Sequence, residues 1–500
     1  MSKVIVIGAG FSGLASASLL AKQGHEVVLL EKNDQAGGRA RQFKENGFTF
    51  DMGPSWYWMP DVFEDFFNLF GKSSKDFYDL KRLDPSYKVV FSQEDQMDLP
   101  AGAEKVAELF ESIESGSSEK LKNFLEDAAY KYQVGMDEFV FKPGNSLLEF
   151  VDLRVFKSLF KLQMLTPISK IIRKEFTDER IRKILEFPVL FLGATPEKTP
   201  ALYSLMNYAD ISLGTWYPIG GFHKVIQAMV EIALSQGVEI KYSQNVEKIS
   251  IDQSIATKVI TKDFEYAADI VVAAADYHHV ETKLIDKKYQ QYSSHYWDSR
   301  VMAPSSLLFY LGIDKKLKNL LHHNLFFDED FSQHAIEIYE NAKWPTAPLF
   351  YTCCPSMTDP TVAPEGKENL FLLLPLAPGL EDSELEREKY FNIMINRLEV
   401  LSKQNIRDHI IYKRSYAMNN FKNDYNAFKG NAYGLANTLT QTAILKPKLK
   451  SKTVKNLFFC GQLTSPGPGV PPSLISGQVA AKEVEKFLIN NKEIHATTFS

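Results

Sequence analysis

Short apolar runs flank a helical segment in the first 31 residues. Residues 4–7 are continuously apolar, as in a buried parallel strand, and residues 25–31, HEVVLLE, form a second run that ends at Glu31. Between them we expect a helix over about residues 13–23, which Gly24 ends. This order predicts a strand–helix–strand unit of a parallel sheet.

Later apolar runs predict a second sheet with strands of mixed direction. Residues 87–101 read as two strands around a polar turn. Further strands are predicted at the runs LLFYLGI, NLFFD, FYTCC and NLFLLLPL, and a helix is predicted over residues 382–403. We therefore expect a mixed sheet with helices on one side, and we find no internal repeat and no low-complexity segment.

Residues 150–174 carry a basic amphipathic pattern. Apolar side chains recur at helical spacing and basic side chains lie between them: Val155, Phe156, Leu159, Phe160 and Leu162, with Lys157, Lys161, Lys170, Arg173 and Lys174. Such a helix either lies in a membrane surface or packs on the core with its lysines in water. The pattern alone leaves both interpretations open.

The composition is that of a globular protein. Of the 500 residues, 45% are apolar and 24% are charged, which suits roughly two or three domains. The net charge of −5 argues against nucleic acid as a partner. The cysteines, Cys353, Cys354 and Cys460, lack CxxC spacing, which argues against a disulfide framework or a zinc site and suits a reducing compartment. We expect neither a signal peptide nor a membrane-spanning helix. The 35 Phe and 22 Tyr fit a large core or an apolar ligand channel equally well.

Three glycines after the first strand carry the first chemical signal. Gly8, Gly10 and Gly13 form a GxGxxG motif. In this motif the first glycine makes the tight turn, the second admits a pyrophosphate, and the third lets helix and strand pack closely. Glu31 ends the second strand, where a carboxylate can accept both ribose hydroxyls of an adenosine. The full arrangement predicts dinucleotide binding, and Glu31 favours FAD or NAD(H) over a ligand with a 2′-phosphate.

The next residues help to choose between FAD and NAD(H). Gly37, Gly38 and Arg39 follow the second strand, where paired glycines admit a cofactor and the guanidinium can neutralise pyrophosphate charge. The stretch GFTFDMGPSWYW, residues 47–58, adds another glycine turn. A simple NAD-dependent dehydrogenase would instead continue with regular βαβ units.

A second glycine-rich loop lies near the other end of the chain. The stretch NLFFCGQLTSPGPGVPPSLISGQVAAKEV, residues 456–484, reads as a strand, a loop and a helix from about Ser473. Gly461, Gly467 and Gly469 let the backbone approach a ligand. Pro471 and Pro472 are expected to fix the shape of the loop before the helix.

These features resemble the superfamily of FAD-dependent amine oxidases and phytoene desaturases. The resemblance begins with residues 8–13, Glu31, residues 37–39 and the stretch FDMGPSW. The stretches WYPIGGFHKVIQAMVEIALSQGVEIKYSQNVEKI and ADIVVAAADYH are similar to the central cofactor-domain segments of that superfamily. GNAYGLANTLTQTAILKP and the C-terminal loop resemble the bacterial-type carotenoid desaturases in particular. The resemblance spans nearly the whole chain and is weakest over residues 75–213.

The resemblance implies an α/β fold with two domains. A Rossmann-like FAD-binding domain of the GR2 (amine oxidase-like) type would use residues 1–72, 214–282 and 452–491. A substrate-binding domain, a mixed sheet plus helices that can contact a membrane, would use residues 73–213 and 283–451. The C-terminal glycine loop would cover the flavin, and the helix after it would point free amides at the pyrimidine edge of the ring and stabilise the reduced, anionic form.

The expected FAD-binding residues come from several short segments, and we expect the binding to be non-covalent. They are Gly8, Gly10, Phe11, Ser12 and Gly13; Glu31 and Lys32; Gly38 and Arg39; Gly53, Pro54 and Ser55; Val246; and Gly461, Gln462, Gly469, Val470 and Pro471. Two positions depart from relatives. Ser465 replaces the histidine of a His-Pro-Gly motif, and Gln462 replaces an acid that binds a ribityl hydroxyl. Gln462 can make the same bond through its amide, whereas the departure at Ser465 removes a candidate acid–base group. No metal is expected.

The implied activity is carotenoid desaturation. FAD would accept a hydride from an allylic carbon of a C40 polyene, and the neighbouring carbon would lose a proton. Phytoene-type substrates and 1-hydroxy monocyclic carotenoids, the latter desaturated at C3–C4, are the expected classes. The expected partners are this lipophilic substrate, a membrane surface and an unknown electron acceptor, with the protein in the cytoplasm at the inner face of the membrane.

Several alternatives share the fold. They are a carotenoid or retinoid saturase or isomerase, a protoporphyrinogen or amine oxidase, and a non-enzymatic lipid escort protein that lacks FAD. The intact set of Gly8, Gly10, Gly13, Glu31 and Arg39 argues against the escort protein.

The sequence identifies no catalytic residue. His278, His279, Asp276 and Arg154 are candidates for a proton acceptor, but each is better explained by a structural role. A carbocation delocalised along a polyene also needs a strong base less than amine or alcohol oxidation does.

Overall fold

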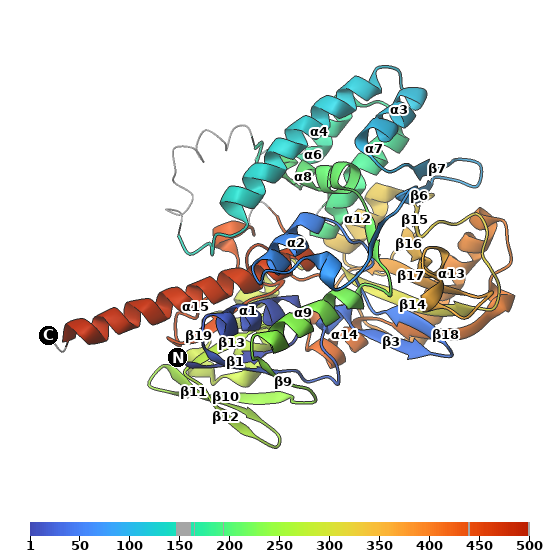
Figure 1. The fold of residues 1–500 in the computed structure, drawn as a ribbon. Coiled ribbons are helices and arrows are strands. Elements are labelled where there is room, and N and C mark those ends of the chain that lie inside the picture. Colours follow the sequence, from blue (N-terminus) through green and yellow to red (C-terminus); the bar gives the residue numbers. More distant parts are fainter. Residues whose placement is uncertain (147–161, 165, 194, 439–440, 499–500) are drawn as a thin grey trace.

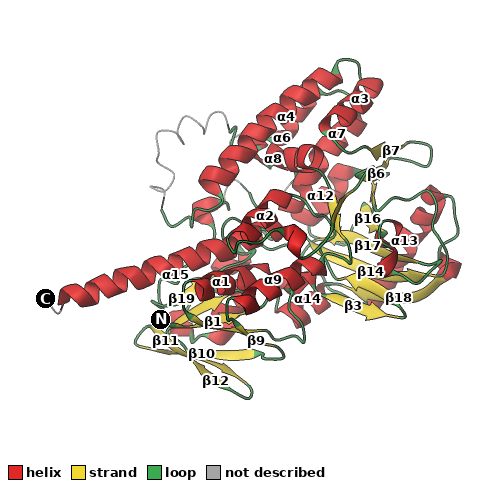
Figure 2. Ribbon diagram, viewed as in Figure 1, coloured by secondary structure: helices red, strands yellow, loops and turns green. Residues whose placement is uncertain are grey.

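Two main sheets joined by helices make up the fold. A computed structural model of the chain describes residues 1–146, 162–164, 166–193, 195–438 and 441–498. A five-stranded sheet lies toward the two ends of the chain, and a seven-stranded sheet lies on the opposite side of the molecule (Figure 1). Helices gather above both sheets in the view of Figure 2, and a smaller three-stranded sheet lies below the first.

The five-stranded sheet is parallel and draws its strands from three distant parts of the chain. Its order is β19-β13-β1-β2-β9, and β1 pairs with β2 in register from Lys3↔Glu26 to Ile7↔Leu30. The strands are β1 (Lys3–Ile7), β2 (Glu26–Leu30), β9 (Glu239–Lys241), β13 (Ile270–Ala273) and β19 (Leu457–Phe459). The two N-terminal strands predicted from the sequence are thus confirmed.

Both faces of this sheet are buried. Successive side chains of a strand point to opposite sides, so each strand contributes residues to both faces. Val4 and Val6 pack toward the helices α1 (Phe11–Lys22), α9 (His223–Ser235) and α15 (Val470–Thr498). Ile5 and Ile7 pack toward the antiparallel sheet of β10 (Val246–Asp252), β11 (Ile255–Thr261) and β12 (Glu265–Ala267). This burial explains the continuously apolar runs of the sequence.

Helix α15 crosses α1 at a glycine. A Cβ atom added to Gly477 would lie 2.2 Å from the carbonyl oxygen of Ser12, so only glycine allows this approach. The contact fixes the C-terminal segment, more than 450 residues along the chain, against the first helix. It therefore positions the loop before α15 next to the loop before α1.

The seven-stranded sheet has the order β18-β14-β17-β16-β15-β6-β7. All its pairs are antiparallel except β15 with β6. The strands are β6 (Tyr87–Val90), β7 (Gln96–Leu99), β14 (Ser305–Ile313), β15 (His323–Phe326), β16 (Phe350–Cys353), β17 (Glu368–Leu376) and β18 (Ile410–Tyr416). The two strands around a polar turn and the four later strands are confirmed, whereas β18 was not predicted.

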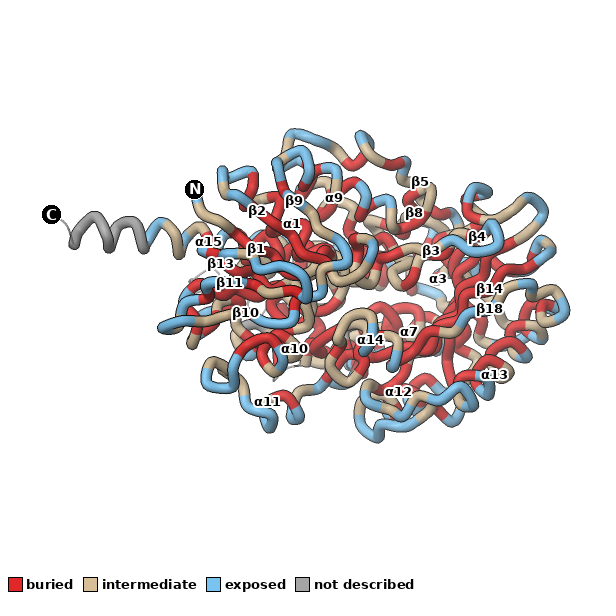
Figure 3. The backbone as a smooth tube through the Cα atoms, turned by 90° about the horizontal axis from the view of Figure 1, so that it is seen from below, coloured by how far each residue is buried: buried red, intermediate tan, exposed pale blue. Residues whose placement is uncertain are grey.

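Helix α13 (Glu384–Ser402) covers one face of this sheet, where Leu307, Phe309 and Leu372 pack against Tyr390 and Met394. It confirms the helix predicted over residues 382–403. Figure 3 shows that buried residues run through the strands of both sheets, whereas exposed residues lie mainly in peripheral loops.

A helical layer lies beyond the sheets. It contains α3 (Ala103–Ile113), α4 (Ser117–Val134), α6 (Ile168–Glu175), α7 (Glu179–Glu186) and α8 (Leu205–Asn207). Of these helices the sequence analysis located only the amphipathic segment that includes most of α6. Of the basic amphipathic segment, Leu162, Ile168 and Ile172 are buried in the core. Val155, Phe156, Leu159 and Phe160, with Lys157, Lys161 and Arg154, lie outside the described residues.

The remaining elements are short. Strands β3 (Gln42–Glu45) and β4 (Phe48–Asp51) form a hairpin, and β5 (Leu80–Arg82) pairs antiparallel with β8 (Trp216–Pro218) from a distant part of the chain. The other α-helices described are α2 (Pro60–Asn68), α10 (Tyr277–His279), α11 (Ser294–Asp298), α12 (Phe331–Tyr339) and α14 (Met418–Tyr425). Within the described part of the chain, every helix is too short or too polar to cross a membrane.

Candidate functional site

The turn between β1 and α1 has the geometry of a phosphate cradle. Gly8, with φ at +102°, donates its amide to the carbonyl of Leu30 at 2.7 Å. A Cβ atom added to Gly10 would meet nothing within 4 Å, and Gly10 lines a cavity. The first amides of α1 have no partner within the helix, and they carry its positive dipole end. This open backbone next to a helix N-terminus suits a pyrophosphate.

Gly13 serves packing rather than ligand contact. A Cβ atom at this position would lie 1.9 Å from the carbonyl oxygen of Gly8. The glycine therefore lets α1 start close to the turn. Among the residues expected to bind the cofactor, it is the one that does not line the cavity.

The other predicted residues come together around one cavity of about 440 Å³. They are Gly8, Gly10, Phe11, Ser12, Glu31, Lys32, Gly38, Arg39, Gly53, Pro54, Ser55, Val246, Gly461, Gln462, Gly469, Val470 and Pro471. Residues from both ends of the chain and from its middle thus line the same cavity. The structure brings them together, and their contacts with a cofactor stay a prediction.

Glu31 is almost fully buried at one end of the cavity. Its Oε2 accepts the amide of Ala9 at 2.8 Å, and its Oε1 accepts the amide and the side chain of Asn33 at 2.9 and 2.8 Å. These bonds hold the carboxylate in place beside the glycine turn. Each oxygen has further lone pairs, so the group can also accept hydroxyl donors from a ribose.

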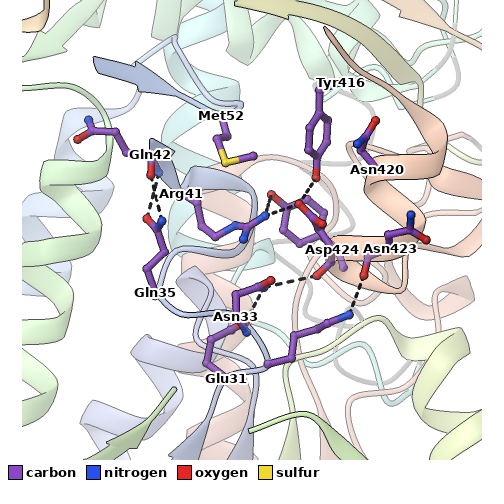
Figure 4. A network of polar contacts seen from close by, with 12 residues as sticks. Glu31, Asn33, Gln35, Arg41, Gln42, Met52, Tyr416, Asn420, Asn423 and Asp424 are labelled. Atoms are coloured by element: carbon purple, nitrogen blue, oxygen red, sulfur yellow. Dashed lines mark hydrogen bonds and ion pairs between the residues drawn. The ribbon is translucent and has the colours of Figure 1, made fainter. Parts of the chain in front are cut away.

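Helix α14 encloses the Glu31 end of the cavity (Figure 4). Asp424 pairs with Arg41 at 2.5 Å and accepts the Tyr416 hydroxyl at 2.8 Å. Lys32 donates to the carbonyl of Asn423 at 2.7 Å, so its ammonium bonds to α14 although the residue lines the cavity. The sequence analysis did not include α14, because nothing local links this segment to residues 31–42.

Arg39 is a half-buried cation with unsatisfied bonding capacity. Its Nη2 donates to the carbonyl of Asn431 at 3.0 Å, and the guanidinium lies 5.0 Å from the centre of the Tyr425 ring. Its Nε is buried without a hydrogen-bond partner. Burial lowers the pKa of Arg39, yet a guanidinium stays protonated in proteins. A half-buried positive charge of this kind at the cavity wall fits an anionic group such as a pyrophosphate.

Gln462 joins the C-terminal loop to this group. With its amide oxygen turned toward Arg39, it accepts from Nη2 at 2.9 Å while its nitrogen donates to the carbonyl of Tyr433 at 3.2 Å. The residue that replaces an acid in relatives is thus fixed against the predicted pyrophosphate-binding arginine. Its other lone pair can face the cavity that it lines.

The C-terminal loop differs from its predicted form in two ways. Helix α15 begins at Val470, not at about Ser473, so Pro471 and Pro472 lie inside its first turn. Proline has no backbone N–H, and the Ser473 amide bonds to the Gly469 carbonyl at 3.1 Å. Of the four residues Val470 to Ser473, Val470 therefore keeps the one backbone amide that is not bonded within the helix. The prediction of several free amides at the start of this helix is therefore wrong, although the positive end of the helix dipole still lies there.

Gly467 also has a different role from the one expected. A Cβ atom there would lie 2.7 Å from the Asn437 side-chain oxygen and 3.2 Å from Nζ of Lys446. Gly467 packs inward, whereas Pro468, Gly469 and Val470 line the cavity. Burial lowers the pKa of Lys446 to about 7, and this residue lay unnoticed in the stretch GNAYGLANTLTQTAILKP.

The rest of the cavity extends to the seven-stranded sheet and α12. This part is lined by Leu308, Leu325, Phe350, Tyr351, Leu373, Pro375, Phe331, His334, Ala335, Ile338 and Tyr339, with Trp56, Trp58 and Phe187 nearby in the same wall. Among the described residues, no Asp, Glu, Lys or Arg of this sheet or of α12 lines it. His334 accepts the Leu349 amide at 3.0 Å and bonds to the Pro375 carbonyl at 3.1 Å, so both ring nitrogens are occupied. This chamber suits an apolar ligand.

Two of the four candidate proton acceptors, Asp276 and His278, make structural contacts. Asp276 accepts the amides of His279 and Phe428 at 3.1 Å each, and burial raises its pKa to about 6. His278 lies against the rings of Phe428 and Trp297 and does not line the cavity. His279 lines it, and burial lowers its pKa to about 4. Arg154 lies outside the described residues.

Comparison with known families gives one match over almost the whole chain. Residues 11–485 match the family described as flavin containing amine oxidoreductase. The match begins at the first residue of α1, just after Gly10, and includes the C-terminal glycine-rich loop and the first half of α15.

Individual relatives match over nearly their full lengths. The chain is 40% identical over 481 residues to a carotenoid 3,4-desaturase of Haloarcula japonica, which covers 96% of this chain and 97% of that protein. It is 32% identical over 498 residues to a 4,4'-diapophytoene desaturase (4,4'-diaponeurosporene-forming) of Staphylococcus aureus, covering 97% and 99%. A solved structure of putrescine oxidase bound to putrescine has a TM-score of 0.62 at 14% identity, covering 97% and 99%. This likeness confirms the predicted amine oxidase-like α/β fold.

Proposed function

The chain belongs to the family of flavin-containing amine oxidoreductases, and within it we propose a FAD-dependent carotenoid desaturase that introduces conjugated double bonds into a C40 polyene. The observation that carries the proposal is the single cavity that joins the glycine turn to an apolar chamber. The names of the two desaturase relatives support the same reaction class. The higher identity to the carotenoid 3,4-desaturase favours 3,4-desaturation over a phytoene-type reaction.

We infer that the FAD lies along the row of predicted residues. Glu31 would accept the ribose hydroxyls, and Gly10 with the N-terminus of α1 would face the pyrophosphate. The Nε atom of Arg39, which has no hydrogen-bond partner in the protein, would donate to the same pyrophosphate. Gly469 and Val470 would lie against the flavin. The discontinuous domain division into residues 1–72, 214–282 and 452–491 is proposed on the same basis, because strands from all three pieces form the parallel sheet.

The chamber beyond this row supports a hydrocarbon substrate. A polyene has no charge to pair, and aromatic and aliphatic walls remove its surface from water at about 25 cal/mol per Å² of apolar area. An amine substrate carries an ammonium, which costs several kcal/mol to bury without a partner. The described residues of the sheet and α12 offer that ammonium no carboxylate. The lining therefore favours the desaturase over an amine oxidase.

The flavin, when bound, supplies the hydride acceptor for C–H oxidation. The protein would hold the polyene against it and exclude water with the apolar walls. The proton released from the neighbouring carbon is not assigned to a residue, and neither is the electron acceptor that reoxidises the cofactor. A saturase or isomerase would use the same cavity, whereas an escort protein would not need the open cradle at Gly10.

Product analysis tests the proposed reaction. The purified yellow protein is incubated in liposomes with phytoene and, separately, with a 1-hydroxylated monocyclic carotenoid. Products are read by absorption and mass. We expect a red-shifted product lighter by two hydrogens per new double bond. A heavier product would identify a saturase, and an unchanged mass with both substrates would reject the desaturase.

Glu31→Ala is expected to weaken FAD binding tenfold or more. Losing hydrogen bonds to a charged acceptor costs about 1.5–3 kcal/mol, which corresponds to roughly ten- to a hundred-fold in affinity. The measurement is a titration of apoprotein with FAD, followed by flavin fluorescence. Glu26→Ala is the control, because its carboxylate lies on the same strand but faces solvent. Equal affinities for the two variants would mean that the adenosine binds elsewhere.

All the flavin is expected to leave the protein on acid precipitation. None of the three cysteines, which all lie in described parts of the chain, lines the cavity. Of the two histidines that line it, His334 has both nitrogens bonded, and His279 lies near Lys32 at the Glu31 end, where the adenosine is proposed to bind. Non-covalent binding is therefore proposed. The measurement compares yellow colour in the supernatant and the pellet, and colour that stays in the washed pellet contradicts the proposal.

We also propose peripheral contact with a membrane, because the substrate partitions into lipid. The basic amphipathic pattern over residues 150–161 supports this, while Leu162, Ile168 and Ile172 of the same segment are buried in the core. Replacing Phe156, Leu159 and Phe160 by Ser is expected to reduce flotation with liposomes while the FAD content stays unchanged. A parallel loss of FAD would instead mean that these residues belong to the core.

A further inference from the structure

Three side chains with metal-binding atoms meet behind the wall of the large cavity. His322 precedes β15, His323 is its first residue, and Cys353 is the last residue of β16. His323 and Cys353 are direct partners across the two antiparallel strands. One ligand atom from each of the three residues lies within 4.8 Å of the others. All three side chains are buried, with exposures of 5%, 0% and 2%.

Each of the two imidazoles is hydrogen-bonded through its Nδ1 atom. Nδ1 of His322 bonds to the Thr358 hydroxyl at 2.8 Å, and Nδ1 of His323 bonds to the Tyr351 hydroxyl at 2.6 Å. Both Nε2 atoms are buried without a hydrogen-bond partner. Metal-binding histidines characteristically bond through one ring nitrogen to a neighbouring group, which fixes the ring and leaves the other nitrogen for the ion.

Unpaired buried nitrogens need an explanation, because nearly all buried polar groups are satisfied. A small cavity of about 20 Å³ lies against His322 and Cys353 and is also lined by Asp51 and Ser55. It has room for about one small species. The Trp56 ring stacks on His323 at 4.1 Å between ring centres and also lines the large cavity. The cluster thus lies outside the proposed substrate chamber.

We propose that His322, His323 and Cys353 bind one zinc ion. Two imidazole nitrogens and one sulfur form a ligand set that suits zinc and disfavours magnesium or calcium, which prefer oxygen. A water molecule in the small cavity would complete four-coordination. The ion would link β15 to β16 behind the Ser55–Trp56 wall, and this role is independent of the proposed reaction.

The charges and protons of the site balance. Each imidazole would bind the ion through the lone pair of a ring nitrogen and would stay neutral. The S–H bond of Cys353 would break as the zinc–sulfur bond forms, and its proton would leave to solvent. Zinc with one thiolate carries one net positive charge. The nearby Asp51 carboxylate can offset that charge.

Metal content tests the proposal directly. The full-length protein, without a histidine tag, is purified without chelators and dialysed, and its zinc and copper are measured by inorganic mass spectrometry. We expect about one zinc per chain. Protein that holds no stoichiometric zinc after incubation with zinc overturns the proposal, and so does protein that holds copper in place of zinc.

Cobalt substitution tests the ligands. Cobalt(II) in a tetrahedral site with a thiolate gives intense absorption in the red, where flavin does not absorb. We expect this band in the wild type and in Cys354→Ser, whose sulfur faces Ser356 and Glu368 instead. We expect Cys353→Ser to lose both the band and the zinc. If Cys353→Ser does not fold, the wild-type spectrum decides, because a weak band there overturns the tetrahedral thiolate site. Retention of zinc by a folded Cys353→Ser also overturns it.

Discussion

Gly10→Val is expected to give a folded protein that carries no flavin. The backbone at Gly10 has φ at −82° and ψ at −174°, a conformation that valine adopts readily. The added side chain meets no protein atom near its Cβ and would project into the cavity where the pyrophosphate is proposed to lie. We expect FAD affinity to fall at least about 100-fold, equivalent to about 3 kcal/mol. Stability should change by only about 1 kcal/mol, because valine is a poorer helix N-cap than glycine.

The matched variant is Gly13→Val in the same motif. Its Cβ would collide with the Gly8 carbonyl at 1.9 Å, so this variant should lose the fold as well as the flavin. Circular dichroism, thermal unfolding and the flavin-to-protein absorbance ratio of the purified proteins separate the two outcomes. Full flavin content in Gly10→Val would mean that the cofactor does not approach this turn.

The cofactor half of the site could be predicted because its signals are local. Gly8, Gly10, Gly13 and Glu31 lie within one strand–helix–strand unit, and their roles follow from backbone geometry over two dozen residues. The C-terminal loop was also recognised from its own glycines. The packing role of Gly13 was predicted from the motif and is confirmed, whereas the packing role of Gly467 needed the position of Asn437, which no spacing in the sequence reveals.

The enclosing elements could not be predicted in this way. Helix α14 lines the cavity through Asp424, which pairs with Arg41, and these two residues are 383 positions apart along the chain. Strand β18 alternates between half-buried and exposed positions, so it lacks the apolar run that identified β14 and β17. The start of α15 was placed too late because its two prolines were read as loop residues, although proline fits the first turn of a helix.

Ala335→Trp is expected to abolish carotenoid turnover while leaving the flavin in place. Ala335 lies on α12, is 5% exposed and lines the apolar chamber away from the glycine turn. An indole at this position would fill space that the polyene needs, and packed interiors do not yield to such an insertion without cost. We expect kcat/KM to fall about 100-fold or more, equivalent to about 3 kcal/mol. Flavin content and the reduction of the flavin by dithionite should stay at wild-type levels.

The next residue of the same helix gives the control. Ile336 is 39% exposed, so Ile336→Trp adds the same side chain to α12 on the solvent side. We expect this variant to keep wild-type activity, because neither the chamber nor the helix packing changes. Both variants add one indole to the same helix. If their flavin contents are equal and their activities differ, the difference comes from filling the apolar chamber. If Ala335→Trp desaturates the carotenoid as fast as Ile336→Trp, the polyene does not pass α12, and the apolar chamber is not the substrate site.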